Sequence, residues 1–136
     1  MLLSVLNRKQ KLKFLDLAMH MVSVDGKPNE FETRVLNMML AEVGDNIISE
    51  YQFALSKKLE ETIDFFVESN VKIRNIVYLN LMRVAMSDDF YNTLEHNFLE
   101  DLRIQLGIDD TKKKQLMRLV YMERDLRERA KRVVTH

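Results

Sequence analysis

Five acidic residues lie in two short segments that share one spacing. Asp25 precedes Glu32 by seven positions, and Asp88 precedes Glu95 by the same seven, with Asp89 next to Asp88. Carboxylate oxygens are the ligands that hard cations such as Ca²⁺ and Mg²⁺ prefer. The two segments therefore predict weak, hydrated divalent-cation sites, with all five residues as candidate metal ligands.

The same carboxylates have a purely structural interpretation. Asn29 and Glu32, like Asn92 and Glu95, stand three positions apart, which is the offset of a capping box at the start of a helix. The spacing of an EF-hand loop is absent, because Lys27 replaces an oxygen ligand in the first segment. Capping and cation binding both remain open for these residues.

The two acidic segments belong to longer stretches that align without gaps. Residues 15–44 match residues 78–107 at an offset of 63 positions, and the identities fall at turn, cap and core positions. The identical pairs are Met19/Met82, Asp25/Asp88, Asn29/Asn92, Glu32/Glu95, Leu36/Leu99 and Gly44/Gly107. We therefore expect two helix-turn-helix repeats, at about 12–44 and about 75–107.

Helix caps and apolar spacing predict helices along the whole chain. The segment that follows Asn70 has the widest apolar surface, so we expect it to be central. Residues 45–55 predict a further short helix, and Gly44 and Gly107 suit helix ends. The expected N-caps are Asn7, Asn29, Ser56, Asn70, Asn92, and either Asp109 or Asp110. No segment predicts a strand, so the expected fold is an all-α, compact bundle of six to seven helices.

Composition limits the class of protein. The chain has 136 residues, of which 46% are apolar, and we interpret it as one helical domain over 1–136. The absence of cysteine excludes disulfides, thiolate zinc sites and cysteine nucleophiles. The longest apolar runs fall far short of the roughly 20 residues that span a bilayer, so we expect a cytoplasmic protein without a transmembrane segment.

Charge divides the chain into an acidic middle and basic ends. Residues 14–111 carry 8 Lys or Arg against 18 Asp or Glu, whereas residues 112–136 carry 9 basic and 3 acidic residues. The basic C-terminal helix, at about 110–133, is a candidate for docking a partner protein or an anionic surface, including peripheral membrane association. Acidic residues interrupt its charge, so we do not expect nucleic-acid binding. Our preferred interpretation is that the basic ends pack against the acidic middle. The apolar residues available for that packing are Leu116, Leu119, Val120, Met122, Leu126 and Ala130.

An Asp-Gly turn followed by Glu in the next helix, as at Asp25-Gly26 and Glu32, resembles the TerB-like family, named for bacterial tellurite resistance. The resemblance covers about residues 12–108. It implies a helical fold with two pseudo-symmetric halves, and an acidic cluster for divalent metal at Asp25, Glu32, Asp88 and Glu95. The second copy departs from the pattern, because Asp89 stands where the first copy has Gly26.

No motif for a catalytic site is present. The sequence has no Walker loop, no Gly-x-Ser-x-Gly elbow and no His-Glu-x-x-His pair. We therefore expect no catalytic residues, no enzyme activity, and no cofactor beyond a possible Ca²⁺ or Mg²⁺. The TerB-like resemblance implies the function of a bacterial stress-response or tellurite-resistance-type interaction module with a weak cation site. The alternative is a scaffold that binds no metal and recruits a partner through its basic C-terminal helix.

Overall fold

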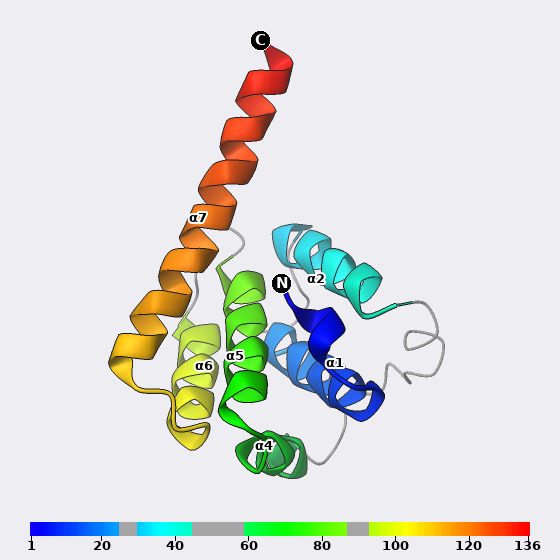
Figure 1. Cartoon of the computed structure of the whole chain (residues 1–136), viewed down its shortest axis with the longest axis vertical. Coiled ribbons are helices and arrows are strands. Elements are labelled where there is room, and N and C mark those ends of the chain that lie inside the picture. Colours follow the sequence, from blue (N-terminus) through cyan, green and yellow to red (C-terminus); the bar gives the residue numbers. More distant parts are fainter. Residues whose placement is uncertain (25–29, 45–58, 87–92) are drawn as a thin grey trace.

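A computed structural model describes residues 1–24, 30–44, 59–86 and 93–136, and every regular element in these ranges is a helix (Figure 1). This confirms the all-α prediction. The elements are η1 Leu3–Val5, α1 Arg8–Val22, α2 Glu30–Val43, α4 Leu59–Val67, α5 Val71–Ala85, α6 Thr93–Gln105 and α7 Asp110–Thr135. The predicted helix over 45–55 and the predicted caps Asn29, Ser56 and Asn92 lie outside the described residues.

Asparagine caps begin α1 and α5, as the sequence predicts. The Asn7 side chain accepts a hydrogen bond from the Gln10 amide at 2.9 Å, and the Gln10 side chain accepts one from the Asn7 amide at 2.8 Å. The Asn70 side chain accepts from the Ile73 amide at 3.0 Å. Each bond satisfies an amide that the first helical turn would otherwise leave without a partner.

The helix bounds repeat at the offset found in the sequence. α1 covers 8–22 and α5 covers 71–85, so both ends differ by 63, and the starts of α2 and α6, at 30 and 93, differ by 63 as well. Gly44 and Gly107 follow α2 and α6 with positive φ angles of 102° and 69°, where a residue without a Cβ is favoured. The ends of α2 and α6, at 43 and 105, differ by 62; nothing in these bounds conflicts with the two predicted repeats, which stay a prediction.

α5 is the central helix, as its wide apolar surface predicts. It packs against α1, α2, α4, α6 and α7, and every residue from Ile76 to Met86 is buried. Phe14 of α1, Phe66 of α4 and Leu99 of α6 are buried in the same core. Figure 1 shows α5 between α6 on one side and α1 with α2 on the other.

The basic ends behave differently from one another. Near the N-terminus, the Lys9 and Lys13 ammonium groups lie 5.3 Å and 6.0 Å from the centre of the Phe65 ring, so this end does pack against the acidic middle. α7 packs against the acidic middle only through its first half, and Figure 1 shows its second half extending beyond the bundle. Every residue from 128 to 136 is exposed.

The expectation that the apolar residues of α7 pack on the bundle is therefore wrong for most of them. Leu116 and Val120 are buried, but Leu119, Met122 and Leu126 are 45%, 59% and 67% exposed. Residues turn by about 100° each around a helix, so Leu126 faces about 80° away from Leu116, the side that meets α5. Ala130 faces only about 40° away from Leu116 and is exposed as well, so orientation alone does not explain the exposure: the second half of α7 extends beyond the bundle (Figure 1). Within the described ranges, no helix is long and apolar enough to cross a membrane.

Candidate functional site

Of the five predicted metal ligands, one has a described side chain. Asp25, Asp88 and Asp89 lie outside the described residues, and Glu32 belongs to α2 but its side chain is not described. Within the part that the structure describes, no group of three or more His, Cys, Asp or Glu side chains is placed to hold a metal ion. The metal site therefore stays a prediction.

Glu95 is the predicted metal ligand whose side chain is described, and its surroundings bear on both the capping and the metal-binding interpretation. It is the third residue of α6, the position from which a capping-box glutamate reaches back to the cap. Its side chain is only 2% exposed. A buried carboxylate requires compensation by hydrogen bonds or by a cation. Both capping and metal binding provide that compensation.

A buried polar cluster joins α5 to α2, α7 and the N-terminal segment. The Arg83 guanidinium donates to the Glu123 carboxylate from Nε at 2.9 Å, and to the Asn80 side-chain oxygen from Nη1 at 2.9 Å. Glu42 of α2 lies 3.9 Å from Arg83 and accepts from the Leu3 amide at 2.9 Å. Arg83 is 6% exposed and Asn80 fully buried, so these bonds form with little competition from water.

The electrostatics of this cluster favour ionised Glu42. Burial alone would raise the pKa of Glu42, but hydrogen bonds from the Met1 amino group and the Leu3 amide, together with the charge of Arg83, lower the pKa below its ordinary value. The Met1 amino group also donates to Asn80 at 2.9 Å. The cluster thus connects α2, α7 and the N-terminal segment to α5. Each charged group described in it lies next to a group of opposite charge.

Sequence reasoning did not single out Arg83 or Asn80. A signal was present, because the two polar residues interrupt an otherwise apolar run from Ile76 to Ala85 in the helix predicted to be central. Polar residues inside a buried helix require partners. No local pattern indicates which partners these are, since Glu42 and Glu123 lie about 40 positions away on either side.

A second ionic cluster holds the start of α7 to α6. The Glu100 carboxylate binds the Arg103 guanidinium at 2.9 Å and the Lys113 ammonium. Hydrogen bonds from Arg103 and Lys113 lower the pKa of Glu100 to about 2, although burial opposes them. Burial raises the pKa of the nearby Tyr78 hydroxyl to about 12, and the charge of Glu100 adds to this effect. Arg103 also donates to the Ile108 carbonyl at 2.9 Å, which fixes the turn into α7.

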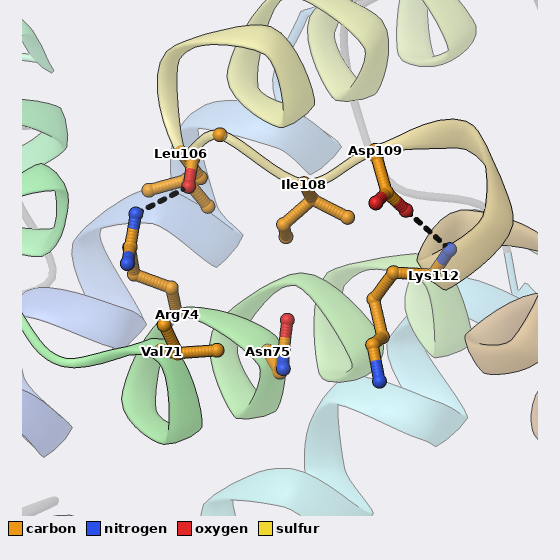
Figure 2. A pocket seen from close by; sticks show the side chains of 8 residues that line it. Val71, Arg74, Asn75, Leu106, Ile108, Asp109 and Lys112 are labelled. Atoms are coloured by element: carbon orange, nitrogen blue, oxygen red, sulfur yellow. Dashed lines mark hydrogen bonds between the residues drawn. The ribbon is translucent and has the colours of Figure 1, made fainter.

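A pocket of about 150 Å³ lies between the start of α5 and the α6–α7 turn. Figure 2 shows Val71 and Asn75 on α5 facing Ile108, with Arg74 on one side and Lys112 on the other. The Arg74 guanidinium donates to the Leu106 carbonyl at 2.8 Å, and Asp109 accepts from the Lys112 amide at 2.7 Å as the cap of α7. The two cations stand apart, and the Asp109 carboxylate lies on the Lys112 side of the pocket (Figure 2). This geometry supports packing of the turn on α5 better than it supports capture of an anion.

The exposed half of α7 carries a surface whose residue types suggest binding. Five residues form what we call the α7 stripe: Leu119, Met122, Leu126, Ala130 and Val133, all exposed. At about 100° per residue they fall within about 80° of arc. Isolated exposed apolar residues are ordinary, but a continuous row on a projecting helix is typical of an interaction surface.

Comparisons with known proteins give no family to which the chain can be assigned. No family model matches the sequence, and neither a curated protein nor a solved structure is significantly similar to it.

Proposed function

We propose that this chain is a non-enzymatic interaction module, and that α7 is the element through which it binds a partner protein. The observation that carries the proposal is the α7 stripe, a row of exposed apolar residues on a helix whose second half leaves the bundle (Figure 1). Covering such a row removes apolar surface from water, which contributes about 25 cal/mol per Å² before the entropic cost of association is subtracted.

The construction of the bundle supports this role. α7 is held at its base by Glu100 with Lys113, by the buried Leu116 and Val120, and by Glu123 with Arg83. These contacts fix the direction of the helix while leaving its far end exposed. A docking element that is already ordered loses less conformational entropy when it binds.

Site-specific photo-crosslinking in cells tests the proposal. A photoreactive amino acid at Met122, on the stripe, should give an adduct of one defined mass, whereas the same group at Glu128, on the opposite face, should not. Leu126→Lys should abolish the Met122 adduct. The matched control is Ile104→Lys on α6, because Ile104 and Leu126 are both 67% exposed. Equal adducts from both faces, or an adduct indifferent to Leu126→Lys, would contradict the proposal.

A weak divalent-cation site is a second candidate function, favoured by the buried carboxylate of Glu95 at the start of α6. Here Asp25 and Glu32 would supply oxygens at one interhelical turn, and Asp88, Asp89 and Glu95 at the other. This is the function that the TerB-like resemblance implies, together with a role in stress response. Titration with Ca²⁺, Mg²⁺ or Mn²⁺ should shift amide NMR signals of these turns, and Asp25→Asn and Asp88→Asn should remove the shifts. Turns that stay unmoved at saturating metal would eliminate this candidate.

A further inference from the structure

The residues of the α7 stripe have the spacing of a helix–helix seam. Leu119, Met122 and Leu126 are separated by three and then four positions, and Val133 follows Leu126 by seven, with Arg129 at the seam position between them and Ala130 next to it. This alternation keeps side chains on the line where two helices meet along their length. The stripe from Leu119 to Val133 runs for about 21 Å, or four turns. A single partner helix therefore matches its shape better than a globular surface does.

The charges beside the stripe indicate the sign of the partner. Arg118 and Arg129 lie along one border, about 60° to 80° from the centre of the stripe at about 100° per residue, and the acidic Asp125 lies on the same side about 100° from the centre. On the other border the nearest charged residue is Glu123, whose carboxylate already binds Arg83 at 2.9 Å. The opposite face carries Glu128, which lies 3.2 Å from Lys131. The charge available to a partner on the stripe is thus positive.

We propose that the occupant of the α7 stripe is an acidic amphipathic helix of another protein, and this rests on the proposed function of α7 as a docking element. Apolar side chains of that helix would cover Leu119, Met122 and Leu126. Its carboxylates would pair with Arg118 and Arg129 along the border. Opposite charges beside an apolar seam set both the choice of partner and its orientation.

A second copy of this chain fits the same surface less well. An antiparallel pair of α7 helices would bring the Arg118 and Arg129 borders of the two copies face to face. A parallel pair would place the two acidic middles side by side, each with 8 basic and 18 acidic residues over 14–111. Like charges in either arrangement oppose the pairing.

An anionic membrane also fits less well. The side of α7 that packs on α5, marked by Leu116 and Val120, is about 80° to 120° around the helix from the centre of the stripe. A flat surface laid on the stripe would therefore come close to the bundle as well. The bundle contains the acidic middle, and its carboxylates would be repelled by anionic lipid within the Debye length of about 8 Å. A narrow helical partner avoids that contact.

The test uses the full chain and a labelled peptide of about three heptads, with leucine at the a and d positions and glutamate at e and g. Fluorescence anisotropy should report binding that weakens as NaCl rises. Leu126→Lys should weaken the binding at least tenfold, and Ile104→Lys should leave it within twofold. Arg129→Glu should weaken it at least fivefold, whereas Lys131→Glu, the same charge change on the opposite face, should have less than half that effect.

Three results would overturn the inference. The first is a peptide that does not bind, or that binds without regard to Leu126 and Arg129. The second is sedimentation of the chain as a dimer that Leu126→Lys dissociates, which would assign the stripe to a second copy. The third is Leu126-dependent binding to vesicles of phosphatidylserine and phosphatidylcholine but not to the peptide. Any of these results could occur together with a partner-specific photo-crosslinked adduct at Met122. In that case the proposed function of α7 would be supported, and the acidic helix would be excluded as its partner.

Discussion

Replacing Arg83 with methionine tests how the buried polar cluster holds α7. Methionine has a similar length and keeps most of the apolar contacts of the arginine stem, but it donates no hydrogen bond. The substitution therefore removes the two hydrogen bonds of the guanidinium, to Glu123 and to Asn80, both at 2.9 Å. It leaves Glu123 and Glu42 without the positive charge that lies between them.

The expected loss of unfolding free energy is about 3 kcal/mol. A hydrogen bond that involves a charged group contributes about 1.5 to 3 kcal/mol, and breaking a buried ion pair costs about 3 to 5 kcal/mol. The lower end applies here, because Glu42 and Glu123 are 28% and 30% exposed and can regain water. Asn80 also keeps the hydrogen bond from the Met1 amino group.

Urea unfolding followed by circular dichroism at 222 nm measures this loss. With a slope of about 1.5 kcal/mol per M, the transition midpoint should fall by about 2 M. Lys114→Met is the matched control, because the Lys114–Asp110 pair at 3.1 Å is 73% and 66% exposed and should contribute less than about 1 kcal/mol. A loss below about 1 kcal/mol for Arg83→Met would refute the reasoning.

Two further measurements test whether the stability lost in Arg83→Met comes from the contact between α5 and α7. Combining Arg83→Met with Glu123→Leu should cost less than the sum of the single substitutions, by about 1 to 2 kcal/mol, if the two side chains act as a pair. Amide hydrogen exchange should accelerate in α7 near Glu123 more than in α4, which packs mainly against α1. Additive losses, or acceleration spread evenly over the bundle, would show that Arg83 does not hold α7 in particular.

Three other predictions concern the helix ends and the second ionic cluster. Asn70→Ala should lower unfolding free energy by about 1 kcal/mol through loss of the α5 cap, and Asn70→Asp should restore most of it in the same urea assay. Gly107→Ala should lower unfolding free energy by about 1 kcal/mol, because Gly107 has a φ of 69° and a Cβ there would lie 3.4 Å from Arg74 Nη1. An unchanged unfolding free energy would show that the turn adjusts freely. The pKa of Glu100 in the folded state is lowered to about 2. Its contribution to unfolding free energy is therefore fully present above the ordinary pKa of 4.5 and is lost as pH falls from about 5 towards 2. Glu100→Gln should flatten that part of the curve of stability against pH relative to the parent chain.

Local chemistry made much of the fold predictable. The capping box at Asn7 and Gln10, the cap at Asn70 and the cap at Asp109 each depend on residues three positions apart, and all three are confirmed. The turn glycines Gly44 and Gly107 were predictable for a similar reason, because a positive φ is a property of one residue.

The candidate sites were less predictable. The metal prediction at Asp25, Glu32, Asp88, Asp89 and Glu95 depends on whether two distant loops come together, which spacing within each loop does not determine. The described part of the chain adds only that Glu95 is buried. The expectation that the basic C-terminal helix packs against the acidic middle was wrong for its second half, because an amphipathic pattern shows which residues favour burial and does not show that a neighbour is present to bury them.

The sequence by itself determined which segments are helices and where most of the described helices begin and end. It also determined that the described residues form helices rather than strands. Both follow because caps and apolar spacing act over three or four residues. Only the tertiary structure decided that Arg83 lies between Glu42 and Glu123, and that α7 leaves the bundle after its base. Both depend on how helices far apart in sequence pack around α5. Packing of that kind is set by the shapes of all the side chains together, and no local pattern encodes it.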